Sequence, residues 1–255
     1  MGSIQIEEIY RRADVYDAVY KGRGKDYAAE ARLVTEHIRR LKPEARSLLD
    51  VACGTGSHLV HLVDHFDTVT GLDRAADMVE TAARRVPGVA LHQGDMRDFR
   101  LPTRFDAVTC LFSSVGYLPD QQALTATLAT FARHTTPGGV VVIEPWWSPA
   151  NFLDGHVSGA TVHEDGRTIA RVSRTVREGG SSRMDVHYTV ADPKAGIAHF
   201  TDTHVMALFT HAEYERAFQQ AGFSVSFVPY EHVGPGLFVG VLDGGATGRA
   251  QGSPA

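Results

Sequence analysis

Short apolar runs alternate with helix-like segments through the first part of the chain. Ahead of the first run, apolar residues recur at helical spacing over 7–20 and 26–41, and we expect two helices there, joined by a turn that contains Gly22 and Gly24. The runs that follow predict strands at 47–52, 68–72, 89–92, 105–111 and 140–144. Strands separated by helical segments are typical of a parallel sheet with crossover helices on both faces.

The pattern changes after Pro149. Apolar and polar residues alternate over 161–176, 182–191 and 197–209, with turn-forming residues between and within these runs. Such alternation predicts antiparallel strands with one buried face. We therefore expect a three-stranded antiparallel insertion near the carboxyl ends of the parallel strands, where open sheets bind their ligands.

The last part of the chain completes the main sheet. Thr210 and Glu213 form a capping-box pattern that begins a helix over 211–221, and strands are predicted at 224–228 and 237–242. The predicted fold is an α/β, doubly wound, mostly parallel seven-stranded sheet of Rossmann-like type with the antiparallel insertion. The expected divisions are N-terminal helices that cover the site (1–45), a cofactor-binding core (46–149), the insertion on the substrate side (150–209), the C-terminal part of the core (210–243) and a disordered tail (244–255).

Composition excludes several classes of protein. The 255 residues are 43% hydrophobic and 22% charged, with a net charge of −5, so no general positive field would attract nucleic acid. The apolar runs are too short to cross a membrane, and we expect a cytoplasmic protein. Cys53 and Cys110 lie inside apolar runs and are interpreted as small buried hydrophobes, without a disulfide or metal role.

The most informative motif is a strand that enters a glycine-containing turn over residues 48–59. Gly54 and Gly56 allow a ligand to approach the backbone, and a following helix would offer free N–H groups to a carboxylate. A dinucleotide site needs a third glycine, but Ser57 and His58 follow instead, which disfavours nicotinamide cofactors. Asp50 would repel a phosphate but could orient an amino group.

Two further acidic residues follow the next two strands in turn. Asp73 ends the second strand at the distance at which a carboxylate accepts from ribose hydroxyls. Asp95 follows the third strand and could read an adenine amino group, while Met96 packs on the ring. Each feature alone has a plainer explanation, as a tight turn, a helix cap or a loop acid. Together they favour S-adenosylmethionine (SAM), which carries an amino-acid end and no phosphate.

Several segments also carry a family resemblance over nearly the whole chain, namely 22–27, 48–56, 93–99, 112–116, 140–147, 171–173 and 236–240. Through them the chain resembles the class I SAM-dependent methyltransferases, and within that class the N,N-dimethyltransferases of TDP-3-amino-3,6-dideoxyhexoses. The resemblance implies successive transfer of two methyl groups to an amine on a nucleotide sugar, as in the desosamine and mycaminose pathways of antibiotic biosynthesis. It also implies a homodimer.

The resemblance assigns residues to the cofactor and to the reacting amine. Tyr16 is expected to face the methionine portion of SAM, and Tyr27 is expected on the sugar side. Ala52 and Leu111 are further candidates for contacts with the cofactor. Tyr117 is expected nearest the amine, as an orienting hydrogen-bond partner because the unperturbed pKa of tyrosine, about 10, does not suit a general base. The plainer alternatives are helix packing for Tyr16 and Tyr27 and loop capping for Tyr117.

The substrate side is predicted from the fourth and fifth strands and the insertion. Ser113 and Trp147 are candidates for sugar or base contacts, whereas Trp146 is expected in the core. Arg171 and Ser173 are the candidates for a pyrophosphate, because strand alternation turns Arg174 to the opposite face and guanidinium groups bind phosphates well. We predict no metal site: the helical stripe of His58, His61 and His65 is interpreted as a solvated face.

One departure from the family pattern leaves the acceptor open. Relatives place an arginine before the final Leu-Phe pair, whereas this chain has Pro235 in the stretch 231–236, and proline cannot bind phosphate. The acceptor would then be either a nucleotide sugar held by other arginines or an amino sugar on a nucleoside or glycoside. A nicotinamide-dependent oxidoreductase, disfavoured also by the lack of a Tyr-x-x-x-Lys pair, and a catalytically silent binding protein are the alternatives from other classes.

Overall fold

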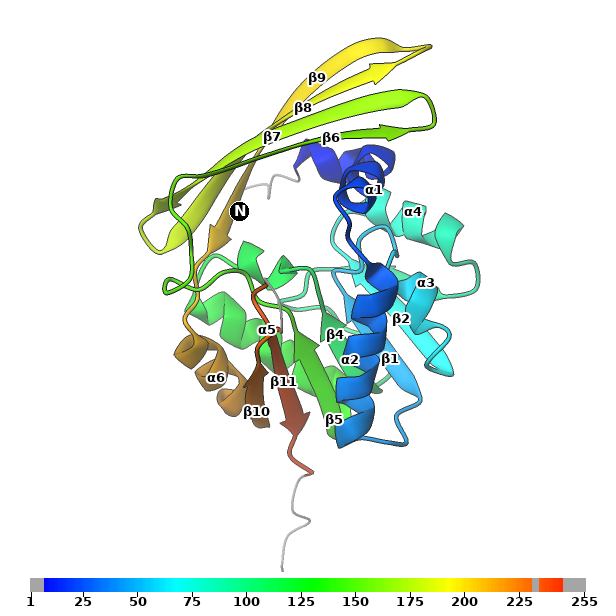
Figure 1. Cartoon of the computed structure of the whole chain (residues 1–255). Helices are drawn as coiled ribbons and strands as arrows, with labels where there is room; N and C mark the ends of the chain where they lie inside the picture. The colour runs from blue at the N-terminus through cyan, green and yellow to red at the C-terminus, as the bar shows by residue number, and fades with distance from the viewer. Residues whose placement is uncertain (1–6, 231–233, 245–255) are drawn as a thin grey trace, which may run out of the picture.

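The computed structural model describes residues 7–230 and 234–244, and it contains two sheets, helices between the strands of the larger sheet and a set of N-terminal helices. The four-stranded sheet arches over the carboxyl ends of the larger sheet, and helix α1 (Ala13–Gly22) lies between them (Figure 1). Of the predicted tail, only Gly244 falls within the described residues, and the segment 231–233 also lies outside them.

The larger sheet confirms the predicted parallel core. Its order is β10-β11-β5-β4-β1-β2-β3, and within this sheet β11 alone runs in the direction opposite to the other strands. The strand order reverses between β1 and β4, which marks the crevice where ligands of such sheets bind. The strands are β1 (Ser47–Val51), β2 (Thr68–Asp73), β3 (Ala90–Gln93), β4 (Phe105–Cys110), β5 (Thr135–Ile143), β10 (Phe223–Val228) and β11 (Leu237–Leu242).

Side chains cap the first turns of three helices, through Asp26, Asp120 and Thr210, and two predicted helices differ from the expectation. The expected helix over 7–20 is split by the non-helical backbone of Arg12 into η1 and α1, and the helix after the glycine turn is only four residues long. Thr210 and Glu213 form the predicted capping box. The other helices are η1 (Glu8–Arg11), α2 (Tyr27–Leu41), α3 (Leu59–Leu62), α4 (Ala76–Arg85), η2 (Ser114–Tyr117), α5 (Gln121–His134) and α6 (His211–Gln220).

The insertion is a four-stranded antiparallel sheet in sequence order, and the prediction of three strands was wrong. Asp165 and Gly166 both adopt positive φ, 51° and 77°, in a tight turn that divides the predicted run 161–176 into two strands. The missed strand begins at His156, and its small residues Ser158, Gly159 and Ala160 weaken the alternation of polarity. The strands are β6 (His156–Glu164), β7 (Arg167–Glu178), β8 (Ser181–Asp192) and β9 (Gly196–Ala207).

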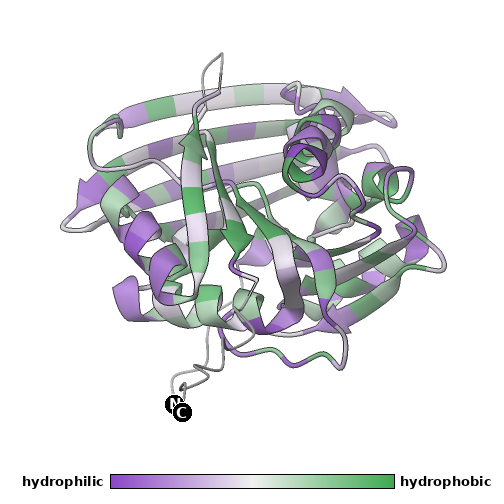
Figure 2. Ribbon diagram, turned by 90° about the horizontal axis from the view of Figure 1, so that it is seen from below, coloured by the Kyte–Doolittle hydropathy of each residue, from purple (hydrophilic) through white to green (hydrophobic). Residues whose placement is uncertain are grey.

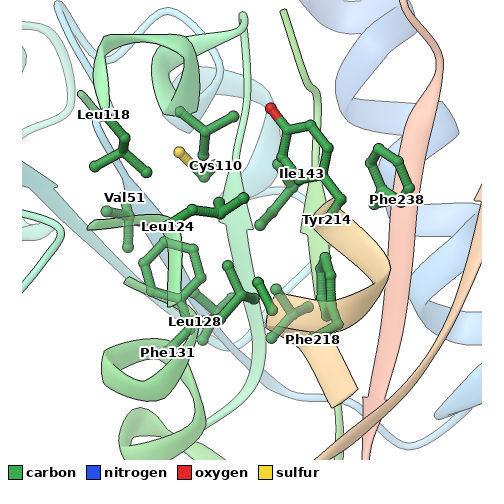
Figure 3. Packing of buried hydrophobic residues seen from close by; sticks show 14 of the residues in the cluster. Val51, Cys110, Leu118, Leu124, Leu128, Phe131, Ile143, Tyr214, Phe218 and Phe238 are labelled. Atoms are coloured by element: carbon green, nitrogen blue, oxygen red, sulfur yellow. The ribbon is translucent and has the colours of Figure 1, made fainter. Parts of the chain in front are cut away.

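Hydrophobic packing fixes both faces of the larger sheet. On one face α5 and α6 bury Leu124, Phe131 and Phe218 against the strands (Figure 3), and Figure 2 shows hydrophobic residues concentrated along the central strands. Cys53 and Cys110 are buried and free, as predicted, and burial raises the pKa of both thiols. Within the described part of the chain, no helix is long and apolar enough to span a bilayer.

Candidate active site

A cavity of about 1270 Å³ separates the carboxyl ends of the parallel strands from the inner face of the four-stranded sheet. A single ligand usually occupies a pocket of about 300–1,000 Å³, so this cavity has room for a cofactor and a second molecule. A small hollow of about 30 Å³ adjoins it. Both are lined by Tyr16, Ala52, Gly54, Phe112 and Ser114.

Sharp turns at the ends of β1 and β4 shape the cavity wall. Ala52, Phe112 and Ser113 have φ values of 59°, 54° and 61°, which residues other than glycine seldom adopt. The Phe112 backbone N–H donates to Glu144 Oε2 over 2.7 Å, and Ser113 Oγ donates to the Pro145 carbonyl over 2.8 Å. These bonds hold a strained backbone of the kind that often occurs at functional sites.

Asp73 connects the second strand to the glycine turn. Its Oδ2 accepts from the Gly54 backbone N–H over 2.9 Å, and its Oδ1 accepts from the Ala75 N–H over 2.8 Å. Burial raises the pKa of this carboxyl, and each oxygen retains a lone pair for another donor. Asp73 and Gly54 both line the cavity, so the predicted ribose acceptor stands beside the glycine turn.

The third predicted cofactor element also lies on the cavity wall, but its carboxylate already has a partner. Asp95 accepts from Arg97 Nε over 2.9 Å and from its terminal nitrogen over 2.7 Å, and these hydrogen bonds lower the pKa of Asp95. Met96 lines the cavity beside them. An adenine amino group would therefore meet a carboxylate that Arg97 holds in place.

Asp50 carries an orphaned oxygen beside the small hollow. The side chain is 1% exposed, and Oδ1 accepts from Thr109 Oγ1 over 2.8 Å, whereas the buried Oδ2 has no partner. Burial raises the pKa of Asp50 to about 6. A buried carboxylate oxygen without a donor is costly, and the ammonium group of an amino acid would satisfy it. The residues present therefore fit the methionine end of SAM.

Two predicted residues lie elsewhere than expected. Tyr27 lines the small hollow beside Leu111 and packs edge-on against the His58 ring at 4.9 Å, and it does not line the larger cavity. Gly56 lines neither hollow. Its φ is 78°, and a Cβ there would stand 3.1 Å from that of Ala82, so this glycine permits close packing on α4.

A buried charge cluster at this end was not predicted. His58 is only 6% exposed and its Nε2 lies 2.8 Å from Glu30 Oε2, so the interpretation as a solvated histidine was wrong. Lys25 donates to Glu30 Oε1 over 2.7 Å and sits 3.9 Å above the Phe112 ring. Burial would raise the pKa of Glu30, but its bonds with His58 and Lys25 lower it. The spacing of the three histidines suggested a surface stripe and concealed this contact.

The substrate end of the cavity is lined by aromatic side chains. Trp147 lines it, and Trp146, predicted to lie in the core, is half-buried and lines it too. Trp146 Nε1 donates to Ser182 Oγ over 2.9 Å, which fixes the indole plane against β8. Ser113 and Ser173 also face this space.

Arg171 brings a buried cation to the same end. It is 4% exposed, and one terminal nitrogen donates to Ser173 Oγ over 2.9 Å. Its Nε is buried without a partner, and among the described residues no carboxylate lies within 4.0 Å of the guanidinium. A buried guanidinium without an anionic partner is costly, so this one favours an anion in the cavity.

Tyr117 lies between two residues that the sequence pattern did not single out. Its hydroxyl is 2.6 Å from the Tyr10 hydroxyl and 2.7 Å from His204 Nδ1, and all three residues line the cavity. Burial raises the pKa of Tyr117 well above its usual value, so the phenol stays protonated. Tyr10 and His204 come from opposite ends of the chain, and only the fold brings them together.

The fold and this site define a class I SAM-dependent methyltransferase, and residues 48–139 match a family described as a methyltransferase domain. The chain is 56% identical over 90% of its length to a dTDP-3-amino-3,4,6-trideoxy-α-D-glucopyranose N,N-dimethyltransferase of Streptomyces venezuelae, of which it covers 97%. It is 53% identical over 94% of its length to a dTDP-3-amino-3,6-dideoxy-α-D-glucopyranose N,N-dimethyltransferase of Streptomyces fradiae, of which it covers 93%.

Solved structures agree with these relatives. The crystal structure of Streptomyces venezuelae DesVI has a TM-score of 0.88 at 54% identity, covering 94% of this chain and 100% of that one. A SAM-bound amino pentose methyltransferase from Micromonospora echinaspora has a TM-score of 0.83 at 44% identity, covering 94% and 99%. The chain belongs to the family of SAM-dependent N,N-dimethyltransferases of dTDP-amino sugars, and SAM is its methyl donor.

Proposed function

We propose that this enzyme adds two methyl groups in succession to the amino group of a dTDP-amino-deoxyhexose in antibiotic sugar biosynthesis. The observation that carries the proposal is one cavity with Asp73 and Gly54 at its cofactor end and the unpaired guanidinium of Arg171 at the other. The relatives from Streptomyces venezuelae and Streptomyces fradiae act on dTDP-3-amino sugars, and one from Saccharopolyspora spinosa, 48% identical, acts on a dTDP-4-amino sugar.

The cofactor end holds SAM through polar groups at each part of the molecule. Asp73 accepts from the ribose hydroxyls, Asp50 orients the amino group, and Asp95 with Met96 takes the adenine. When bound, SAM would supply a methyl group on a sulfonium, and an attacking amine would take up this methyl group and displace the thioether. Tyr16 closes the cofactor end from α1, and burial raises the pKa of its hydroxyl well above the usual value, so it remains an uncharged donor.

The substrate end holds the nucleotide and the sugar. Arg171, with Ser173 beside it, binds the pyrophosphate, and Trp147 with Ser113 contacts the sugar or base. Pro235 does not line the cavity. The phosphate-binding guanidinium is therefore supplied by the inner face of the four-stranded sheet.

The reaction depends more on the relative positions of the two reactants than on an acid or base. The neutral amine attacks in line, its nitrogen gains the carbon as the sulfur keeps the bonding electron pair, and the ammonium product then releases a proton to solvent. Holding the two reactants in line contributes much of the rate in such reactions. Tyr117 is the side chain that orients the amine for this attack.

Mass spectrometry tests the reaction. The enzyme is incubated with SAM and either a dTDP-3-amino-3,6-dideoxyhexose, its 4-amino isomer, or a phosphate-free amino sugar glycoside. We expect a gain of two methyl masses on a nucleotide sugar and none on the glycoside. Methylation of the glycoside alone would replace the acceptor in this proposal, and turnover of none of the three would refute it.

The affinity for SAM should depend on pH through Asp50. Its pKa is about 6, and only the carboxylate attracts the cofactor's ammonium, so binding strengthens as the pH rises through 6. Below that pH the affinity should fall by up to about tenfold per unit. Calorimetry between pH 5 and 8 measures the slope. In Asp50→Asn the affinity for SAM should be lower and should not change with pH over this range. An equal pH dependence in both proteins would contradict the role of Asp50 in binding the ammonium group.

Tyr117→Phe should slow methylation at saturating substrate and leave SAM affinity unchanged. The ring still fills its place, so only the hydroxyl contact with the amine is lost, and we expect a loss of about tenfold or more. Single-turnover rates measure the effect, with calorimetry of SAM alongside. A variant that turns over at the parent rate would show that Tyr117 only supports the loop.

A further inference from the structure

The chain of hydrogen bonds behind Tyr117 ends on a buried histidine. His204 is 4% exposed, and it lies on the inner face of β9, two residues from Asp202. Burial lowers the pKa of His204 to about 4, with a nearby Arg171 acting in the same direction and Asp202 opposing it. The imidazole is therefore neutral at physiological pH, with one ring nitrogen bare and the other protonated.

The surrounding fold fixes the positions of the hydrogen-bonded residues Tyr10, Tyr117 and His204. Asp202 accepts from the backbone N–H groups of Glu8 and Ile9 over 2.7 and 2.9 Å, which anchors the segment that carries Tyr10. A Cβ at Gly116 would stand 2.7 Å from the Met206 side chain, so the segment that carries Tyr117 is pressed against β9. Strand β9 thus positions Tyr10, Tyr117 and His204.

The direction of the hydrogen bonds decides whether the Tyr117 hydroxyl acts as a donor or as an acceptor toward the amine. A phenol has one proton and two lone pairs. If Nδ1 of His204 is bare, Tyr117 must donate its proton to it and accept from Tyr10, which leaves one lone pair for an N–H of the substrate. If Tyr117 donated to the amine instead, it would occupy the lone pair that has to attack.

We propose that His204 is a positioning residue that accepts a hydrogen bond from the Tyr117 hydroxyl at Nδ1, and so keeps Tyr117 an acceptor toward the amine during both methyl transfers. The inference rests on the proposed function and deepens it. The primary amine and the monomethylated secondary amine both have an N–H to donate. The neutral dimethylated product has none, so the same geometry that aligns two transfers does not align a third.

Two kinetic variants test the inference against a matched control. His204→Phe removes the acceptor and His204→Asn retains one near the position of Nδ1, while His199→Phe changes an exposed histidine on the same strand. We expect His204→Phe to lower the rate by about tenfold or more, with SAM affinity unchanged and monomethylated product accumulating. His204→Asn should recover part of the rate and restore dimethylation, and His199→Phe should match the parent.

A double variant and a spectroscopic measurement separate positioning from folding. In a Tyr117→Phe background, His204→Phe should cause no further loss, because the hydroxyl it orients is gone. Nitrogen-15 NMR of the labelled parent enzyme should show Nδ1 of His204 without a proton.

Some outcomes would overturn the inference about His204, and a different outcome would refute the proposed function. Additive losses in the double variant, a parent-like rate or product ratio in His204→Phe, or a protonated Nδ1 would overturn the inference. The NMR result stands even if a variant does not fold. A parent enzyme that methylates no amino sugar would instead refute the proposed function, because the tautomer is measured without turnover.

Discussion

Replacing Arg171 with methionine should raise the KM for the nucleotide sugar by roughly a hundredfold. Two lost charge-assisted hydrogen bonds to phosphate oxygens, at about 1.5–3 kcal/mol each, account for about 3 kcal/mol or more. SAM affinity should not change, because Arg171 lies on the four-stranded sheet, whereas Asp73 ends β2 of the larger sheet. The same variant should be more stable without ligand, on the order of 1 kcal/mol, because it no longer buries an unpaired charge.

Arg174→Met is the matched control for this experiment. Arg174 lies three residues along β7 from Arg171, on the opposite, exposed face. Its substitution therefore removes the same charge without changing the cavity. Steady-state kinetics with the nucleotide sugar and denaturant unfolding measure the two effects. Equal KM values in the two variants would show that the pyrophosphate is bound elsewhere.

Asp73→Ala should weaken SAM binding by roughly a hundredfold. The substitution removes the acceptor for the ribose hydroxyls and leaves the N–H groups of Gly54 and Ala75 without their partner. One charged hydrogen bond is worth about 1.5–3 kcal/mol, and the upper end of that range corresponds to this change in affinity. Isothermal titration calorimetry with SAM measures it directly.

Two companion variants make the Asp73 result specific. Asp77→Ala removes an exposed carboxylate from the first turn of α4 and should bind SAM as the parent does. Asp73→Asn should fall between parent and alanine, because the amide keeps one acceptor but turns an NH₂ group toward a backbone donor. If Asp73→Ala binds SAM with unchanged affinity, the carboxylate serves only to cap the turn.

The sequence determined the parts of the molecule that depend on local pattern. Apolar runs with helical segments between them require a covered parallel sheet, and Thr210 with Glu213 caps α6 as predicted. The glycine turn and Asp73 lie at successive strand ends, so parallel topology alone places them at one edge. Where the local signal was weak, the prediction failed: the small residues around Gly159 concealed β6, and Arg12 divided an expected helix.

Tertiary structure decided which side chains meet in the cavity. His58 looked like part of an exposed stripe, yet Glu30 on another helix buries and pairs it. Tyr10 and His204 are 194 positions apart and carry no motif, and they converge on Tyr117 because the four-stranded sheet folds back over the strand ends. Residue spacing specifies contacts within an element and between neighbouring strands, whereas contacts between distant segments depend on how whole sheets pack.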